Sequence, residues 1–153
     1  MSPAKEQFLR MKRYLARMED RGASDEATDD MYSFFMHAWH LCDWTCHDGT
    51  LALYPHLDDK KRLKRIKTKD VSKIIRLCGN VADRTKHFKL SKKKRMLPAV
   101  TRKNISITPG SGLPAQADYL FEFPDGSKKD ALEFARQVVK DWGNLLKRYG
   151  LLL

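Results

Sequence analysis

The sequence predicts a mainly α-helical fold, a four-helix bundle with a small antiparallel β-hairpin inserted before the last helix. Apolar residues recur every three or four positions along four long segments, as they do on the buried face of a helix. Only residues 103–123 alternate polar and apolar side chains as a pair of strands would. The 153 residues suit one hydrophobic core. We therefore expect a single domain over residues 1–153.

The first two expected helices each begin at a serine. Ser2 can cap a helix over residues 2–19, and Pro3 suits the first helical position because its missing N–H has no partner there. Ser24 can cap a second helix over residues 24–48, in which acidic side chains occupy the first turn.

The middle of the chain contains a third expected helix after a basic connection. The helical pattern breaks down over residues 50–69, which are compatible with either a short basic helix or a loop. Thr68 or Asp70 can then cap a third helix that reaches about Phe88.

A hairpin and a fourth helix complete the expected fold. Residues 104–108 and 119–123 read as strands joined by a loop rich in proline, glycine and serine. The last helix is expected over residues 127–149, because Ser127 and Asp130 have the spacing of a capping box.

The positive charge of the chain is concentrated in one segment. Residues 1–59 carry six basic and eleven acidic side chains (net −5), and residues 104–153 carry six of each. Residues 60–103 carry eighteen basic and two acidic side chains, a net charge of +16. This segment predicts a polyanion such as RNA as partner, and a merely solvated basic surface is the alternative. The expected nucleic-acid-binding residues are Lys60, Lys61, Arg62, Lys64, Arg65, Lys67, Lys86, Lys89, Lys92, Lys93, Lys94 and Arg95.

A polar stripe on the third expected helix is a candidate catalytic site. At helical spacing Asn80, Arg84 and His87 lie on one face, and Asp83 lies beside Arg84. A carboxylate orients an imidazole and raises its basicity, while a guanidinium holds a phosphate. These are the groups that acid–base cleavage of RNA requires.

The second expected helix carries a matching polar stripe. His37, His40 and His47 share a face, and Asp43 lies one turn from the last two. If the second and third helices pack antiparallel, the two stripes face each other. The alternative is a buried hydrogen-bonded network that only fixes the helix register. The candidate catalytic residues are His87, Arg84, Asp83, Asn80, His40 and Asp43.

The cysteines and the amino terminus indicate a cytoplasmic protein. Cys42, Cys46 and Cys78 occupy apolar positions of helical patterns, which is typical of buried thiols in a reducing compartment. With His47 and His87 they supply enough zinc donors, but no Cys-x-x-Cys pair exists and the donors lie on different faces. We expect neither a metal nor another cofactor. No signal segment and no run of roughly 18 apolar residues is present, so no membrane contact is expected.

Several segments together resemble a group of small uncharacterised bacterial helical proteins, whose third-helix signature reads roughly C-x-D-x-A-N-x-S-K-H-F-x-L. Lys86-His87-Phe88-x-Leu90 is the most specific part of a resemblance that covers about residues 30–148. The segments are His40-Leu41-Cys42-Asp43-Trp44, Cys78 through Leu90, Asp125-Gly126, Asp130-Ala131-Leu132-Glu133 and Trp142.

The helical layout of that group is in turn similar to the HEPN superfamily (higher eukaryotes and prokaryotes nucleotide-binding). The resemblance implies an RNA-directed helical domain, commonly dimeric, with any active site at the end of the third helix. It also implies a metal-independent endoribonuclease of a defence or toxin-type system, in which His87 acts as acid or base. A non-enzymatic interaction module or accessory subunit, such as a homodimer with structural His and Asp stripes, is the alternative.

Overall fold

The computed structural model describes residues 1–21, 25–48, 53–86, 99–102, 119–122 and 128–152 and shows a mainly helical protein, as the sequence predicts. In this part of the chain the helical elements are α1 (Pro3–Arg21), α2 (Asp25–His47), α3 (Asp59–Arg65), the π-helical turn η1 (Ile66–Asp70), α4 (Lys73–Lys86) and α5 (Ala131–Arg148). The three short strands are β1 (Ala99–Arg102), β2 (Tyr119–Glu122) and β3 (Lys128–Asp130).

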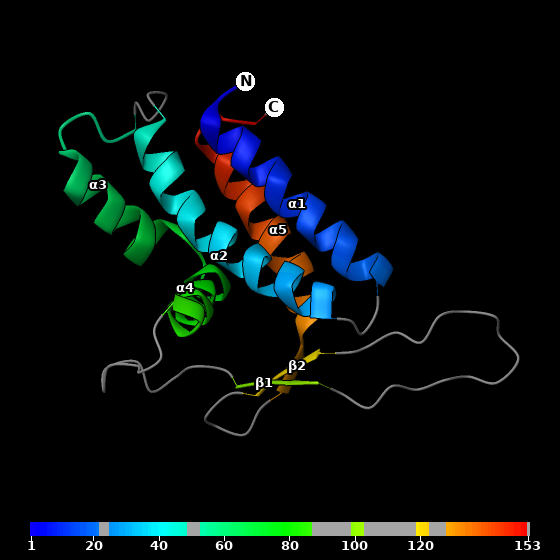
Figure 1. Ribbon diagram of the computed structural model, residues 1–153. Helices are drawn as coiled ribbons and strands as arrows, with labels where there is room; N and C mark the ends of the chain where they lie inside the picture. The colour runs from blue at the N-terminus through cyan, green and yellow to red at the C-terminus, as the bar shows by residue number, and fades with distance from the viewer. Residues whose placement is uncertain (22–24, 49–52, 87–98, 103–118, 123–127, 153) are drawn as a thin grey trace, which may run out of the picture.

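Helix α2 is the centre of the bundle, because it contacts α1, α3, η1, α4 and α5. Figure 1 shows α1 and α5 on one side of α2 and α3 on the other, with the two termini close together at one end. Helix α4 is seen almost along its axis while α2 lies across the view, so these two helices cross steeply. The antiparallel packing that would make the two polar stripes face each other is therefore not what the structure has.

The core joins α2 to α5 and α1 through large apolar side chains. The Trp142 indole is completely buried, and its Nε1–H donates a hydrogen bond of 2.9 Å to the carbonyl oxygen of Ala38. This bond satisfies the polar atom of the ring, which burial would otherwise make costly. The Phe35 and Phe134 rings pack with centroids 5.6 Å apart. Core side chains that are fully buried include Trp142, Phe34, Phe35, Met11, Met31, Leu41 and Ile75.

The connection over residues 50–69, for which the sequence favours neither helix nor loop, contains a helix. Asp58 caps α3 by accepting a hydrogen bond of 2.8 Å from the Lys61 amide. The chain then widens into the π turn, in which the Val71 N–H donates to the Ile66 carbonyl oxygen at 3.0 Å. The buried Ile66 side chain anchors this turn against the core.

The cap of α4 differs from the prediction. Neither Thr68 nor Asp70 can cap the helix, because the chain stays helical through Asp70 and becomes extended only at Val71. Ser72 is the first residue after this break, and its Oγ accepts a hydrogen bond of 3.2 Å from the Ile75 amide. At the start of α1 the predicted cap is confirmed, since Ser2 Oγ accepts from the Lys5 amide at 3.2 Å.

The last helix also begins later than predicted. Asp130 is the N-cap of α5, and its Oδ1 accepts hydrogen bonds from the amides of Leu132 (2.9 Å) and Glu133 (3.0 Å). The reason is that residues 128–130 pair with β2 as strand β3, so the helix cannot start before Ala131. Ser24 and Ser127, the other two predicted caps, lie outside the described residues.

The predicted hairpin over residues 103–123 is not shown. Its first arm, residues 104–108, lies outside the described residues, whereas β2 coincides with the second predicted strand. Strand β2 pairs antiparallel with β1 on one edge and with β3 on the other.

None of the helices that the structure describes combines the length and the apolar character needed to cross a lipid bilayer.

Gly79 of α4 lies directly against the Trp39 ring of α2. A methyl group at this position would lie 2.7 Å from Cε2 of the Trp39 ring. We expect Gly79→Ala to lower the free energy of unfolding by about 1–3 kcal/mol, because the ring must shift, although alanine is the better helix former. Urea denaturation measures this change.

Gly143→Ala in α5 is the matched control. There the added methyl group would meet only Phe8 Cζ at 3.6 Å, an ordinary contact. We expect this variant to be neutral or more stable by up to about 1 kcal/mol. Equal effects of the two substitutions would contradict the close packing at Gly79.

Candidate nucleic-acid interface

The carboxylate of Asp70, the last residue of η1, links the start of the basic segment (residues 60–103) to the core. Its Oδ2 accepts hydrogen bonds from the Tyr54 hydroxyl at 2.7 Å and from the Tyr149 hydroxyl at 2.5 Å. Tyr149 is buried at the end of α5, and burial, followed by the hydrogen bond to Asp70, raises the pKa of its phenol. One carboxylate thus joins η1 to the preceding connection and to the last helix.

Two cations of the segment are held by carboxylates. Lys67 Nζ lies 3.3 Å from Asp43 Oδ1 on α2 and 5.2 Å from the centroid of the Trp39 ring. Arg62 pairs with Asp59 within α3. Both cations are half-buried, so they are less available to a ligand than the exposed Lys60, Lys61, Lys64 and Arg65.

The remaining cations from α3 to the start of α4 face the solvent without a carboxylate partner among the described residues. We call this surface the basic face. The Arg65 guanidinium carbon lies 4.6 Å from the centroid of the Tyr54 ring. Arg76 donates through Nη1 to the carbonyl oxygens of Thr68 (2.9 Å) and Val71 (3.3 Å). These contacts hold each guanidinium in place without an ion pair to a carboxylate. The seven exposed residues of the basic face are Lys60, Lys61, Lys64, Arg65, Lys69, Lys73 and Arg76.

The exposed cations of the basic face differ in part from the predicted nucleic-acid-binding residues. Lys69, Lys73 and Arg76 belong to the basic face although the sequence analysis did not select them. Their signal was their position within the same basic run. Among the predicted residues, the side chain of Lys86 and the whole of Lys89, Lys92, Lys93, Lys94 and Arg95 lie outside the described part.

The candidate catalytic residues of α4 are described only in part. His87 lies outside the described residues, as do the side chains of Asp83 and Arg84. Asn80 is half-buried on α4. The proposed pairing of these residues with the α2 stripe stays a prediction.

Two residues of the α2 polar stripe, Asp43 and His37, contact different helical elements. Asp43 binds Lys67 of η1, and no described imidazole contacts its carboxylate. His40 is exposed. His37 points to the other side of α2, where its ring stacks on Tyr14 of α1 with centroids 5.2 Å apart and an angle of 18° between the planes. The polar stripe of α2 is thus divided between contacts to η1 and contacts to α1.

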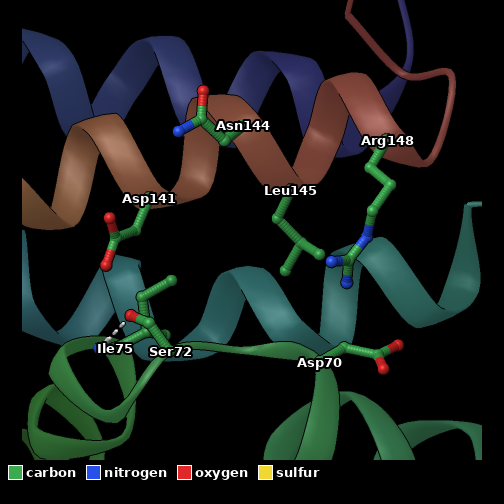
Figure 2. A pocket seen from close by; sticks show the side chains of 7 residues that line it. All are labelled: Asp70, Ser72, Ile75, Asp141, Asn144, Leu145 and Arg148. Atoms are coloured by element: carbon green, nitrogen blue, oxygen red, sulfur yellow. Dashed lines mark hydrogen bonds between the residues drawn. The ribbon is translucent and has the colours of Figure 1, made fainter.

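A cavity that the sequence analysis did not predict lies between α5 and the start of α4. It has a volume of about 300 Å³, and Figure 2 shows Asp141 and Arg148 extending toward it from α5. Asp141 accepts a hydrogen bond from Gln137 at 2.7 Å, and Ser72 opposite uses its hydroxyl as the helix cap. Among the described residues its lining contains the carboxylates of Asp70 and Asp141 but neither an imidazole nor a thiol.

The three thiols are buried and form no disulfide. Burial raises the pKa of Cys42 and Cys78 above the ordinary value, which keeps both thiols neutral at pH 7. Across the described residues, no group of three or more His, Cys, Asp or Glu side chains is arranged to hold a metal ion.

No protein-family model, curated protein or solved structure matches this chain.

Removing the Asp70 carboxylate tests how the basic segment is held. We expect Asp70→Ala to lower the free energy of unfolding by about 1–3 kcal/mol, because the buried Tyr149 hydroxyl loses its acceptor. Adding Tyr149→Phe to this variant should restore part of the loss, since the unpaired hydroxyl is then absent. Urea denaturation of both variants measures the effect.

Tyr54→Phe is the control for this prediction. Tyr54 is only half-buried, and its removal leaves Asp70 bonded to Tyr149, so the expected cost is about 1 kcal/mol or less. An Asp70→Ala variant as stable as Tyr54→Phe would show that the carboxylate does not anchor η1.

Proposed function

We propose that this chain binds RNA or a similar polyanion through the basic face. The observation that carries the proposal is that seven exposed cations, all within Lys60 to Arg76, form no ion pair with a carboxylate among the described residues. A surface of ordinary composition mixes charges of both signs, whereas this one is positive apart from the exposed Asp58 and Asp59 at the start of α3. Phosphates that bind such a surface release their condensed counterions, which supplies most of the free energy of nonspecific binding.

The acidic groups near the basic face support the same proposal. Asp70 is bonded to two tyrosines, Asp43 holds Lys67, and Asp59 holds Arg62. Each of these carboxylates therefore has a structural partner, and among the seven exposed cations Asp70 acts electrostatically on Arg65 without forming an ion pair with it. The field over the basic face stays positive, which attracts phosphates at a distance as well as on contact.

We extend the proposal to a cytoplasmic HEPN-like domain that acts on RNA in a defence or toxin-type system, as a homodimer. The resemblance of the segment around His87 carries this extension, and the mainly helical architecture is compatible with it. In this proposal His87 is the acid or base and Arg84 holds the phosphate, in a metal-independent endoribonuclease.

Binding without catalysis is the second candidate, and two contacts favour it. Asp43 binds Lys67, and His37 stacks on Tyr14, so two residues of the α2 polar stripe have structural partners. In a non-enzymatic module these contacts hold the helices that present the basic face. Cleavage assays separate the two candidates.

The first test of the proposed function is the salt dependence of RNA binding. We expect Lys64→Gln with Lys69→Gln to weaken binding of a single-stranded RNA and to reduce the slope of log affinity against log salt by about 1 to 1.5. The reason is that two fewer counterions are released. Fluorescence anisotropy at several salt concentrations measures both quantities.

A charge-matched double variant controls for the total charge of the protein. Lys140→Gln with Lys147→Gln removes two exposed cations from α5, and we expect it to keep the affinity and slope of the parent. If the two double variants weaken binding equally, or if the parent does not bind RNA at about 50 mM salt, the basic face is not the binding surface.

The second test asks whether bound RNA is cleaved. The HEPN-like proposal predicts cleavage in the presence of EDTA, and it predicts that His87→Ala lowers the rate at least about a hundredfold because an acid or base is lost. RNA affinity should change little, since the basic face is intact. His56→Ala, at an exposed histidine before α3, is the control and should cleave as the parent does. If RNA stays intact in long incubations, the endoribonuclease proposal is contradicted and the non-enzymatic module is favoured.

A further inference from the structure

Three arginines of α1 line a second cationic site. Arg10, Arg13 and Arg17 recur at spacings of three and four residues, and together with Tyr14 they surround a surface hollow of about 240 Å³. Helix α1 lies on the opposite side of α2 from α3 (Figure 1), so this hollow is separate from the basic face. We call it the arginine hollow.

The charges in the arginine hollow are only partly neutralised. Arg17 forms an ion pair with Asp30, in which Nη2 lies 2.9 Å from Oδ1. Arg10 lies 3.9 Å from Glu6, and these side chains are 42% and 60% exposed, so that pair is weak. Arg13 is exposed and has no carboxylate partner among the described residues. One full positive charge thus stays uncompensated, and a second is only loosely paired.

Tyr14 gives the arginine hollow a fixed wall. Its ring stacks on His37 of α2, and the Arg17 guanidinium lies 4.6 Å from its centroid. The same guanidinium is held by Asp30, so it is fixed from two directions. Side chains that are already ordered lose less entropy when a ligand binds.

We propose that the arginine hollow binds a phosphate group. A guanidinium presents parallel N–H donors that match two phosphate oxygens, and arginine is over-represented where such groups are recognised. Arg13 and Arg10 supply the donors that are free to turn toward the ligand, and Arg17 adds a fixed positive charge. This inference does not rest on the proposed function, because it uses none of the residues of the basic face.

His37 is an internal reporter of occupancy. Burial lowers the pKa of its imidazole, and the positive charge of Arg10 and the neighbouring His40 lower it further. An anion bound at Arg10 would offset that positive charge, so the protonated imidazole would become more favourable. Binding of phosphate should therefore raise the pKa of His37.

The experiment follows the His37 ring by NMR across a pH titration, with the resonance assigned through a His37→Gln variant. The probes are inorganic pyrophosphate and, in a separate arm, a short single-stranded RNA. We expect saturating pyrophosphate to raise the pKa of His37 in the parent and in a Lys140→Gln control. In Arg13→Gln the affinity for pyrophosphate should fall at least about tenfold, because a charge-assisted contact is lost.

The two probes distinguish the sources of the phosphate. A response to pyrophosphate alone assigns the arginine hollow to a small phosphorylated ligand, and a response to RNA that Arg13→Gln abolishes assigns it to a nucleic-acid backbone. The Lys64→Gln with Lys69→Gln variant should keep the pyrophosphate response even if RNA binding fails. The proposal is overturned if neither probe, at up to about 10 mM, changes the pKa of His37, or if Arg13→Gln and Lys140→Gln weaken the response equally.

Discussion

The Asp70 carboxylate is the constraint on which the position of the basic face depends. It accepts hydrogen bonds from Tyr54 before α3 and from Tyr149 at the end of α5, two residues that are far apart in the sequence. Because η1 ends at Asp70, the π turn and the first turn of α4 are held in one place relative to the core. A strongly basic segment would otherwise repel itself and extend. The buried phenol and the carboxylate together hold that charge on an ordered surface.

A second line of contacts positions the basic face against α2. Asp43 binds Lys67, Lys67 lies over the Trp39 ring, and the Trp39 ring packs on the backbone of α4 at Gly79. Through these contacts Asp43 of α2 helps to hold η1 against α2 in the described structure. It also explains why α4 crosses α2 so closely, since only a glycine leaves room for the ring.

Two cationic surfaces result from this architecture, one on each side of α2. The basic face is a row of exposed lysines and arginines on α3, η1 and the start of α4, suited to a long and repetitive anion. The arginine hollow is smaller, has an aromatic wall and is partly balanced by Asp30 and Glu6, which suits a single phosphate group. The central helix separates them, so each can be altered without removing the residues of the other.

The sequence by itself determined the elements whose periodicity is long and regular. It predicted α1, α2, α4, α5 and strand β2, as well as the segment that carries the positive charge. Only the tertiary structure decided the form of residues 59–70, because seven helical residues followed by a π turn are too short for periodicity and are held by the partners of Asp70 and Ile66. The caps of α4 and α5 were decided in the same way, by the extended Val71 and by the pairing of β3. The partners of Asp43 and His37 depend on which helix lies beside each face of α2, and helical spacing within one segment carries no information about its neighbours.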